Sequence, residues 1–320
     1  MEKGVENLIL NAGNLKKDEK LLILFDNTTK NIAENFAYIA KKYTDNIFLE
    51  KVKSSNIHGK EPGEKIKQKM LNADLIICLT KNSLAHTDAR IKANERGVRF
   101  LSLPDYNIDI LKNEAVLVNF KKHIKNTEKI TELLTLGKNI KIITTNGTCL
   151  YANIENRFGN CCPGYTNEKY LLGSPPDIEA NIAPIENKTT GVIIADGSIT
   201  DCRIGLLRDK VRLDIKNGLI TNIQSENLKH VDLLNKIFDN DKKRILAEIG
   251  IGLNKKAKIC GNMLIDEGCY GAIHFGFGSN ITIGGDNNVN FHLDFVIKKP
   301  TLQIDAQTII KEGVFSDSKL

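Results

Sequence analysis

The sequence predicts an α/β protein with two domains: a doubly wound, mostly parallel sheet at the N-terminus and a mainly-β α+β domain at the C-terminus. Three observations support this class. Residues 1–140 alternate short apolar runs with amphipathic segments, the order typical of parallel sheets covered by helices. From residue 141 onward, β-rich runs dominate. A length of 320 residues exceeds what one small core usually accommodates, which favours two domains.

The first domain is expected to contain four strands with three helices between them. The strands are predicted over residues 21–27, 46–52, 74–80 and 98–104, and the helices over 28–43, 62–73 and 88–97. This order implies parallel strands joined by right-handed crossovers. No GxGxxG or GxxxxGK[ST] pattern follows any of these strands, so a nucleotide site is not indicated.

A helix over 125–139 leads to the second domain, and the boundary is placed to give domains 1–140 and 141–320. Asn146-Gly147 and Asn217-Gly218 are hairpin signals because both residues tolerate positive φ. Strands are predicted over 141–154, 190–199, 211–223 and 301–315, with one amphipathic helix over 226–239.

Composition excludes several functional classes. The net charge is +6, but lysines alternate with acids on the predicted helices and tryptophan is absent, which argues against nucleic-acid binding. No membrane-spanning run and no export signal are found, so no membrane partner is expected. The seven cysteines include no CxxC pair, which favours reduced thiols and a cytoplasmic location. Cys161 and Cys162 are expected to be ordinary loop thiols, with a redox pair as the alternative.

Three segments share one pattern, in which one strand face is apolar and the other carries metal-ligand side chains. Residues i, i+2 and i+4 of a strand share a face. In 247–254 that second face carries Glu248 followed by two glycines, in 273–278 it carries His274 followed by two glycines, and in 291–295 it carries His292 and Asp294. The remaining histidines, His58, His86, His123 and His230, lie among lysines and are expected at the surface.

Glycine inside a strand removes packing surface and suggests the close approach of another group. Glycines beside Glu248 and His274 are expected to leave space for an ion and a substrate. Imidazole with carboxylate is a ligand set for zinc, manganese, cobalt or ferrous iron. A hydrogen-bonded His-Asp pair at a sheet surface and a barrel bend at Gly-x-Gly are the non-functional alternatives, but three repeats of the pattern favour a metal-binding domain.

The block from Ala247 to Ile309, together with "SPPDIEANIAPIENKTTGVIIADGSI" at 174–199, resembles the aminopeptidase T family of metallopeptidases, which has ferrous 2,5-dihydroxypyridine dioxygenases among its relatives. The resemblance implies that Glu248, His274, His292 and Asp294 bind divalent metal, and that Glu179 bridges two ions or acts as general base. It also implies a homodimer. At the position of the family's tyrosine ligand this chain has Ile281.

Three functions remain open. The first is a Zn-, Co- or Mn-dependent hydrolase that removes N-terminal residues from a peptide, with metal-activated water as nucleophile. The second is a one-iron oxygenase acting on a small molecule, in which His274 or Glu248 joins His292 and Asp294; the missing tyrosine favours it. The third is a non-catalytic or specialised biosynthetic member of the family.

Overall fold

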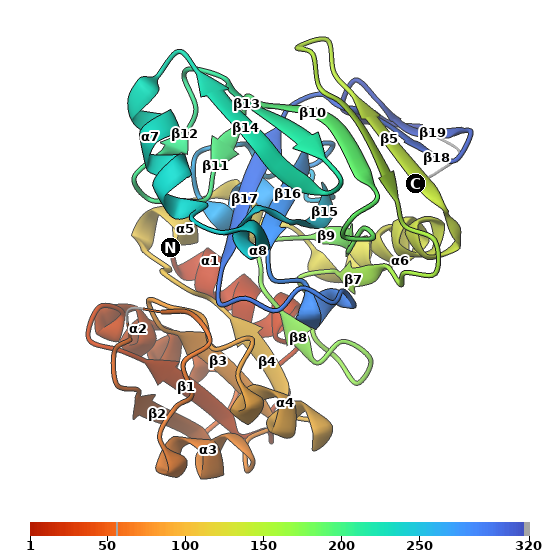
Figure 1. Cartoon of the computed structure of the whole chain (residues 1–320). Coiled ribbons are helices and arrows are strands. Elements are labelled where there is room, and N and C mark those ends of the chain that lie inside the picture. Colours follow the sequence, from red (N-terminus) through yellow and green to blue (C-terminus); the bar gives the residue numbers. More distant parts are fainter. Residues whose placement is uncertain (56, 317–320) are drawn as a thin grey trace. The chain divides into compact units, whose positions relative to one another are not determined.

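The computed structural model describes residues 1–55 and 57–316, which form two compact units (Figure 1). The first unit comprises Met1–Ile124 and Cys162–Pro176, and the second comprises Lys125–Cys161 and Asp177–Leu320. The chain therefore passes between the units at three points. The division into 1–140 and 141–320 stays a prediction of the sequence, and residues 317–320 lie outside the described part.

The first unit contains a parallel sheet with the strand order β2-β1-β3-β4-β8. Its four long strands are those expected from the apolar runs, and the fifth comes from the returning segment. Their bounds are β1 Leu21–Phe25, β2 Ile47–Lys51, β3 Leu75–Leu79, β4 Arg99–Ser102 and β8 Leu172–Gly173. The doubly wound parallel sheet predicted from the alternating pattern is thus confirmed.

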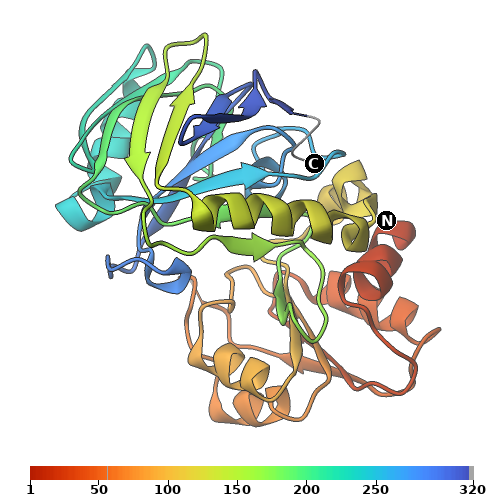
Figure 2. The ribbon, with the colours of Figure 1, turned by 90° about the vertical axis from the view of Figure 1, so that its right-hand side faces the viewer.

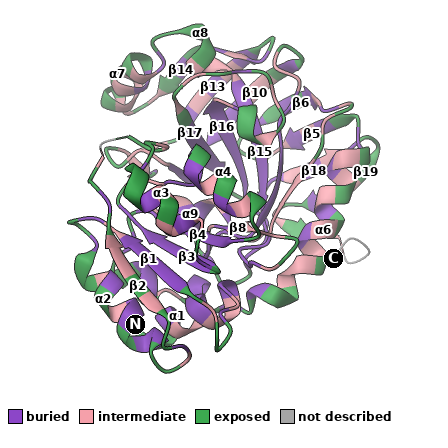
Figure 3. Ribbon diagram, turned by 90° about the horizontal axis from the view of Figure 1, so that it is seen from below, coloured by how far each residue is buried: buried purple, intermediate pink, exposed green. Residues whose placement is uncertain are grey.

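Helices cover the sheet of the first unit. Leu22, Ile76 and Phe100 belong to a core that also contains Ile66 of α3 and Ala93 of α4. β1, β3 and β4 are buried along most of their length (Figure 3). The helical segments are α1 Glu2–Asn7, η1 Leu8–Ala12, α2 Lys30–Ala40, α3 Glu64–Met70, α4 Asp88–Glu95, α5 Ile108–Lys112, η2 Glu114–Leu117 and the first turn of α6 Phe120–Leu136. The N-terminal helical segment, α1 with the π-helix η1, was not foreseen.

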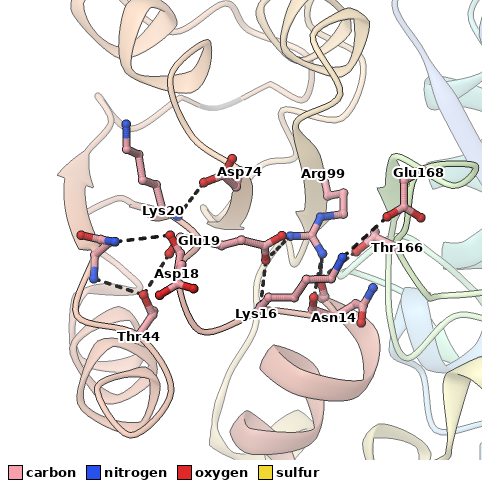
Figure 4. A network of polar contacts seen from close by, with 12 residues as sticks. Asn14, Lys16, Asp18, Glu19, Lys20, Thr44, Asp74, Arg99, Thr166 and Glu168 are labelled. Atoms are coloured by element: carbon pink, nitrogen blue, oxygen red, sulfur yellow. Dashed lines mark hydrogen bonds and ion pairs between the residues drawn. The ribbon is translucent and has the colours of Figure 1, made fainter.

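Arg99 at the start of β4 is the centre of a polar network in the first unit (Figure 4). Its side chain is 7% exposed and donates to the backbone carbonyls of Gly13 at 3.1 Å and Asn14 at 2.7 Å. It also pairs with the carboxylate of Glu19. A buried guanidinium is stable only when its donors are satisfied, so this network ties the segment before β1 to the sheet.

Replacing Arg99 with methionine is expected to lower the free energy of unfolding by on the order of 3 kcal/mol, because Glu19 and two carbonyls lose a buried cationic donor. Urea unfolding measures this loss. The matched control is Lys16→Met, since the side chain of Lys16 is 58% exposed and its ion pair with Glu168 contributes little. Equal stabilities of the two variants would contradict the assignment.

The second unit contains two sheets built largely from antiparallel pairs. The strand orders are β14-β13-β10-β6-β5-β18-β19-β20 and β12-β11-β17-β16-β15-β9-β7. The bounds of the first sheet are β5 Asn139–Ile143, β6 Cys149–Asn153, β10 Thr189–Ala195, β13 Val211–Lys216, β14 Leu219–Ser225, β18 Thr301–Ile304, β19 Gln307–Lys311 and β20 Val314–Phe315. Those of the second are β7 Asn160–Cys162, β9 Glu179–Ile182, β11 Ser198–Ile199, β12 Gly205–Leu206, β15 Leu246–Gly252, β16 Ile273–Gly278 and β17 His292–Ile297.

Turn chemistry explains the hairpins of the first of these sheets. Asn217 and Gly218 both have positive φ, 49° and 75°, and form the two-residue turn between β13 and β14. Asn146-Gly147 lies in a longer loop between β5 and β6, whose strands pair from Asn139 opposite Asn153 to Ile143 opposite Cys149. Both predicted hairpins are present.

Helices of the second unit pack against its sheets, and Phe238 at the end of α7, Leu228–Ile237, contacts Phe277 of β16 and Phe295 of β17. α6 runs along the β7 edge of the second sheet, where Gly159 packs against Thr131 and Leu134 (Figure 2). The other helical segments are α8 Asp241–Arg244, α9 Met263–Glu267 and η3 Ile281–Ile283. Among the described residues, no helix is both long and apolar enough to cross a bilayer.

Candidate metal centre

The five residues expected to bind metal or act on water lie on four adjacent strands of one sheet, in the order β17-β16-β15-β9. Glu179 is on β9, Glu248 on β15, His274 on β16, and His292 and Asp294 on β17. The strands β15, β16 and β17 are buried almost throughout (Figure 3). The fold therefore places all five residues close together.

Strand register sets the arrangement of the site. Gly250 of β15 lies between Asn181 of β9 and His274 of β16 in one row across the sheet. In a second row, Gly276 of β16 lies between Glu248 and Asp294. Directly paired residues share a face, so each row presents two polar side chains with a glycine between them.

Short distances join the side chains into one cluster. Nε2 of His274 lies 3.1 Å from Oε2 of Glu179 and 3.8 Å from Oε1 of Glu248. Nε2 of His292 lies 3.2 Å from Oε2 of Glu248 and 3.0 Å from Oδ1 of Asp294. Glu248 therefore contacts both histidines with different oxygens and lies at the centre of the cluster.

Two groups of three side chains could each surround a cation. One comprises Glu179, Glu248 and His274, and the other comprises Glu248, His292 and Asp294; within each group the ligand atoms lie within 4.8 Å of one another. Glu248 belongs to both. The side chain of His292 is 36% exposed while those of the other four residues are buried, so the second group is the one reached by solvent.

The glycines make room for the histidine rings. A Cβ at Gly250 would lie 2.0 Å from Cε1 and 2.1 Å from Nε2 of His274, and a Cβ at Gly276 would lie 2.5 Å from Nε2 of His292. From the sequence, these glycines were expected to leave space for an ion and a substrate. That expectation needs correction for Gly250 and Gly276, since the imidazole rings of His274 and His292 occupy the space that a Cβ would take there.

Neighbouring groups orient the candidate ligands. Nδ1 of His292 lies 3.2 Å from the carbonyl oxygen of Ser279, so the Nδ1–H tautomer leaves Nε2 free to bind a cation. Oε1 of Glu179 accepts a hydrogen bond of 2.7 Å from Asn181 Nδ2. The hydroxyl of Thr200 lies 3.3 Å from Oδ2 of Asp294 and accepts from its backbone N–H. Sequence reasoning missed Asn181 and Thr200, although Asn181 follows Glu179 at the i+2 spacing of one strand face.

The residues present fit a divalent cation. Oε2 of Glu179 is buried and accepts no well-directed hydrogen bond, although Nε2 of His274 is 3.1 Å away. Nδ1 of His274 is also buried without a hydrogen-bond partner. Oε2 of Glu179 and Nε2 of His274 are therefore close together without a well-directed hydrogen bond between them. This arrangement is expected where two ligand atoms are directed at a shared ion. Buried carboxylates in excess over imidazoles also call for added positive charge.

Two further acids lie beside the cluster and were missed by the sequence analysis. Burial, and then the charge of Glu179, raises the pKa of Asp177 well above its usual value. Burial, and then the charge of Asp294, does the same to the pKa of Glu267 at the end of α9. Asp177 lies two residues before Glu179, so the i+2 rule could have found it; Glu267 comes from a helix, and no strand pattern points to it. Both acids therefore hold a proton to higher pH than an exposed carboxyl would.

The histidines and the acids they contact shift in opposite directions. Burial alone lowers the pKa of His274, but the carboxylates of Glu179 and Glu248 outweigh it and raise that pKa well above normal. The pKa of His292 is raised in the same way, against burial, by Asp294 and Glu248. Burial opposes, yet the imidazoles lower, the pKa of Glu248 and of Asp294. Without an ion, imidazolium supplies the missing positive charge.

These pKa shifts predict how the stability of the metal-free protein depends on pH. Unfolded histidine loses its proton near about pH 6.5, whereas the folded state keeps it, so stability is lost as pH rises from there through the folded pKa of His274 and His292. Asp177 and Glu267 contribute in the same direction from about pH 4 upward. The lowered pKa values of Glu248 and Asp294 give a contribution that disappears only in acid.

The thermal unfolding midpoint of EDTA-treated protein is therefore expected to decrease as the pH is raised from about 6 to about 9. Over the same interval, the stabilisation by added Fe²⁺ or Zn²⁺ is expected to increase, because the ion needs neutral imidazole. Thermal unfolding at several pH values, with and without ion, measures both trends. A midpoint of the metal-free protein that rises with pH would contradict the assignment.

Fold and site together define a two-unit α/β protein with a His-carboxylate centre on an antiparallel sheet. The family model for 2,5-dihydroxypyridine 5,6-dioxygenase (NicX) matches residues 8–317. The chain belongs to this family. No curated protein matches the chain.

Two solved structures share the fold. The 2,5-dihydroxypyridine dioxygenase from Pseudomonas putida KT2440 superposes with a TM-score of 0.82 at 16% identity, covering 99% of this chain and 96% of that one. Wild-type AmpT from Thermus thermophilus superposes with a TM-score of 0.70 at 14% identity, covering 98% of each chain. The resemblance to a group containing both kinds of protein is supported, and the family match favours the dioxygenase alternative over the hydrolase placed first by the sequence analysis.

Proposed function

We propose that the protein is a non-haem Fe(II) dioxygenase that acts on a hydroxylated pyridine or a related catechol-like ring. The observation that carries the proposal is the family match over residues 8–317, joined to a buried centre of histidine and carboxylate. This donor set contains no cysteine and suits ferrous iron. Ile281 agrees with the proposal, because it stands where the resemblance to aminopeptidase T expects a tyrosine ligand and its apolar side chain cannot bind a second ion.

The group formed by Glu248, His292 and Asp294 is the proposed iron site. The sequence left open whether His274 or Glu248 joins His292 and Asp294, and Glu248 is the one that lies within reach of both. Ferrous iron bound there would supply the redox chemistry that lets a ring diol react with dioxygen. The partial exposure of His292 gives a substrate access to this side of the cluster.

The surrounding residues have separate tasks in this reaction. The Ser279 carbonyl holds the proton on Nδ1 of His292 and thereby keeps Nε2 directed at the site. Thr200 orients Asp294. Asp177 and Glu267, whose pKa values are raised by burial and by neighbouring carboxylates, are the candidate proton donors beside the cluster.

Oxygen uptake tests the proposal. Protein purified without oxygen and loaded with Fe²⁺ is expected to consume one O₂ for each 2,5-dihydroxypyridine whose ring absorbance is lost. Zn²⁺-loaded protein serves as the control, because zinc has no redox chemistry. If the iron-loaded protein consumes no oxygen with every member of a panel of dihydroxypyridines and catechols, the proposal is overturned.

A two-ion hydrolase is the second candidate, and one observation favours it. The five residues form two three-ligand groups that share Glu248, as a bridging carboxylate between two cations requires. Elemental analysis separates the two candidates. Two Zn²⁺ or Mn²⁺ per chain with cleavage of amino-acid anilides would support the hydrolase, whereas a single iron with oxygen uptake would support the dioxygenase.

A further inference from the structure

The segment between β16 and β17, residues 279–291, contains buried amide side chains that the proposed chemistry does not use. Asn280 is fully buried and Asn287 is 6% exposed. Oδ1 of Asn280 accepts from the N–H of Asn287 at 2.8 Å, and Nδ2 of Asn287 donates to the carbonyls of Gly278 and Lys242 at 2.6 and 2.7 Å. Such a satisfied buried network specifies one conformation of the segment.

Glu186, which is not part of this segment, accepts hydrogen bonds from it. Its Oε1 accepts 2.8 Å hydrogen bonds from Asn280 Nδ2 and from the backbone N–H of Asp286. Its Oε2 accepts a 2.6 Å bond from Arg157, which also donates to the carbonyl of Gly284. The side chains of Arg157 and Glu186 are only 15% and 19% exposed. The pair is therefore a largely buried clamp on residues 280–286, and we call it the Arg157–Glu186 clamp.

Glycine at position 285 shows how closely the clamped segment is packed. A Cβ at Gly285 would lie 2.0 Å from Cγ and 2.1 Å from Nδ2 of Asn280. The N–H of Gly285 also donates to the carbonyl of Asn280 at 2.9 Å. The amide that Glu186 accepts from is thus confined on its other side by backbone, which leaves it little freedom to turn.

Two hydrogen-bond routes lead from the clamped segment to the candidate ligands. The first is direct: the carbonyl of Ser279, immediately before Asn280, accepts from Nδ1 of His292. The position of that carbonyl decides the direction of the His292 ring and therefore of its Nε2. The backbone N–H of Ser279 also donates to the carbonyl oxygen of Phe291, the residue before His292. The first and last residues of the segment 279–291 are therefore joined next to His292.

The second route crosses the sheet edge. Nδ2 of Asn160 donates to the carbonyl of Ile283 at 3.3 Å and to Oδ1 of Asn181 at 3.0 Å. Asn181 in turn donates to Oε1 of Glu179 at 2.7 Å. This route reaches a ligand of the first three-residue group, whereas the first route reaches a ligand of the second group.

We propose that Arg157 and Glu186 are positioning residues of the metal centre: by clamping the segment 280–286 they set the directions of His292 and Glu179. Neither residue belongs to the candidate ligand groups. The inference rests on the metal site of the proposed function and is independent of whether the bound ion carries out oxygenation.

Glu186→Gln tests the proposal, because it keeps the size of the side chain but removes its charge and places an amide against existing donors. The matched control is Glu226→Gln at an exposed position. In metal-free protein, the ¹⁵N imidazole resonances of His292, assigned with a His292→Ala variant, report the hydrogen bond to Ser279. Co²⁺ serves as the second probe, through its affinity and its visible absorption bands.

In the Glu186→Gln variant we expect a shifted Nδ1 resonance of His292, altered Co²⁺ bands and a Co²⁺ affinity that is about 10–100-fold weaker, with cooperative unfolding retained. The Co²⁺ affinity of Arg157→Lys is expected to lie between those of the wild type and Arg157→Ala. Lysine keeps the positive charge but cannot donate to Glu186 and to the Gly284 carbonyl at the same time. The Glu226→Gln control should match the wild type in every measurement.

A lower thermal midpoint with an unchanged His292 resonance and unchanged Co²⁺ affinity would show that the clamp is only structural and would overturn the proposal. A wild-type protein that binds neither Co²⁺ nor Fe²⁺ would overturn the metal site, and the inference with it. A protein that binds Co²⁺ and responds to Glu186→Gln as expected, but consumes no oxygen with iron, would overturn only the proposed function.

Discussion

Glu248→Gln is expected to remove bound metal and to lower activity by at least about 100-fold, more than any other single change at the site. Glu248 is the residue common to both candidate ligand groups, and its two oxygens approach His274 and His292 separately. The amide cannot supply the negative charge that a divalent cation needs. Metal content per chain and oxygen uptake measure the two losses.

Glu226→Gln provides the control for Glu248→Gln, since it makes the same chemical change at an exposed position. Circular dichroism of both variants separates a lost ion from a lost fold. A Glu248→Gln protein that retains the metal content of the wild type would show that the cluster does not bind the ion through its central carboxylate.

Gly250→Ala is expected to have the second largest effect, because its added methyl group would occupy the place of the His274 ring. The ring must move away from Glu179 or the strands must separate, which costs about 1–3 kcal/mol of folding free energy and displaces a candidate ligand. Thermal unfolding and metal titration measure these effects. Gly63→Ala is the matched control, since nothing lies within 4 Å of a Cβ there and φ is −62°.

A second substitution sharpens this test. Combining Gly250→Ala with His274→Ala removes the ring that the new methyl group would meet, so stability is expected to recover relative to Gly250→Ala alone, while metal binding does not. Wild-type metal affinity in the single variant would mean that His274 is not held over Gly250 in the way the register implies.

Much of the fold could be predicted because its signals are local. β1, β3 and β4 are short apolar runs, and Asn217-Gly218 tolerates the two positive φ angles of a tight turn. The N-terminal π-helix was missed, because its side chains show no period that sets it apart. The segment that returns to the first unit as β8 was also missed, since a two-residue strand is defined only by its partner β4.

The candidate site could be predicted in part. Alternation along each of the three strands placed Glu248, His274, and the pair His292 and Asp294 on the polar face of its strand. In the structure these polar side chains lie close together. Alternation does not show which residue of a neighbouring strand lies opposite, so the glycines were assigned to an ion and a substrate instead of to the rings. A hydrolase was placed first because the C-terminal block resembles aminopeptidase T, and the same ligand types suit both chemistries.

By itself, the sequence determined the strands, their polar faces and the residue types of the centre, since these follow from period-two alternation and side-chain chemistry. Only the tertiary structure decided that Glu248 is central, that glycines 250 and 276 accommodate rings, and that Arg157 pairs with Glu186. These relations join residues far apart in the chain. They depend on strand register and on a folded loop, and no local pattern of amino acids encodes either.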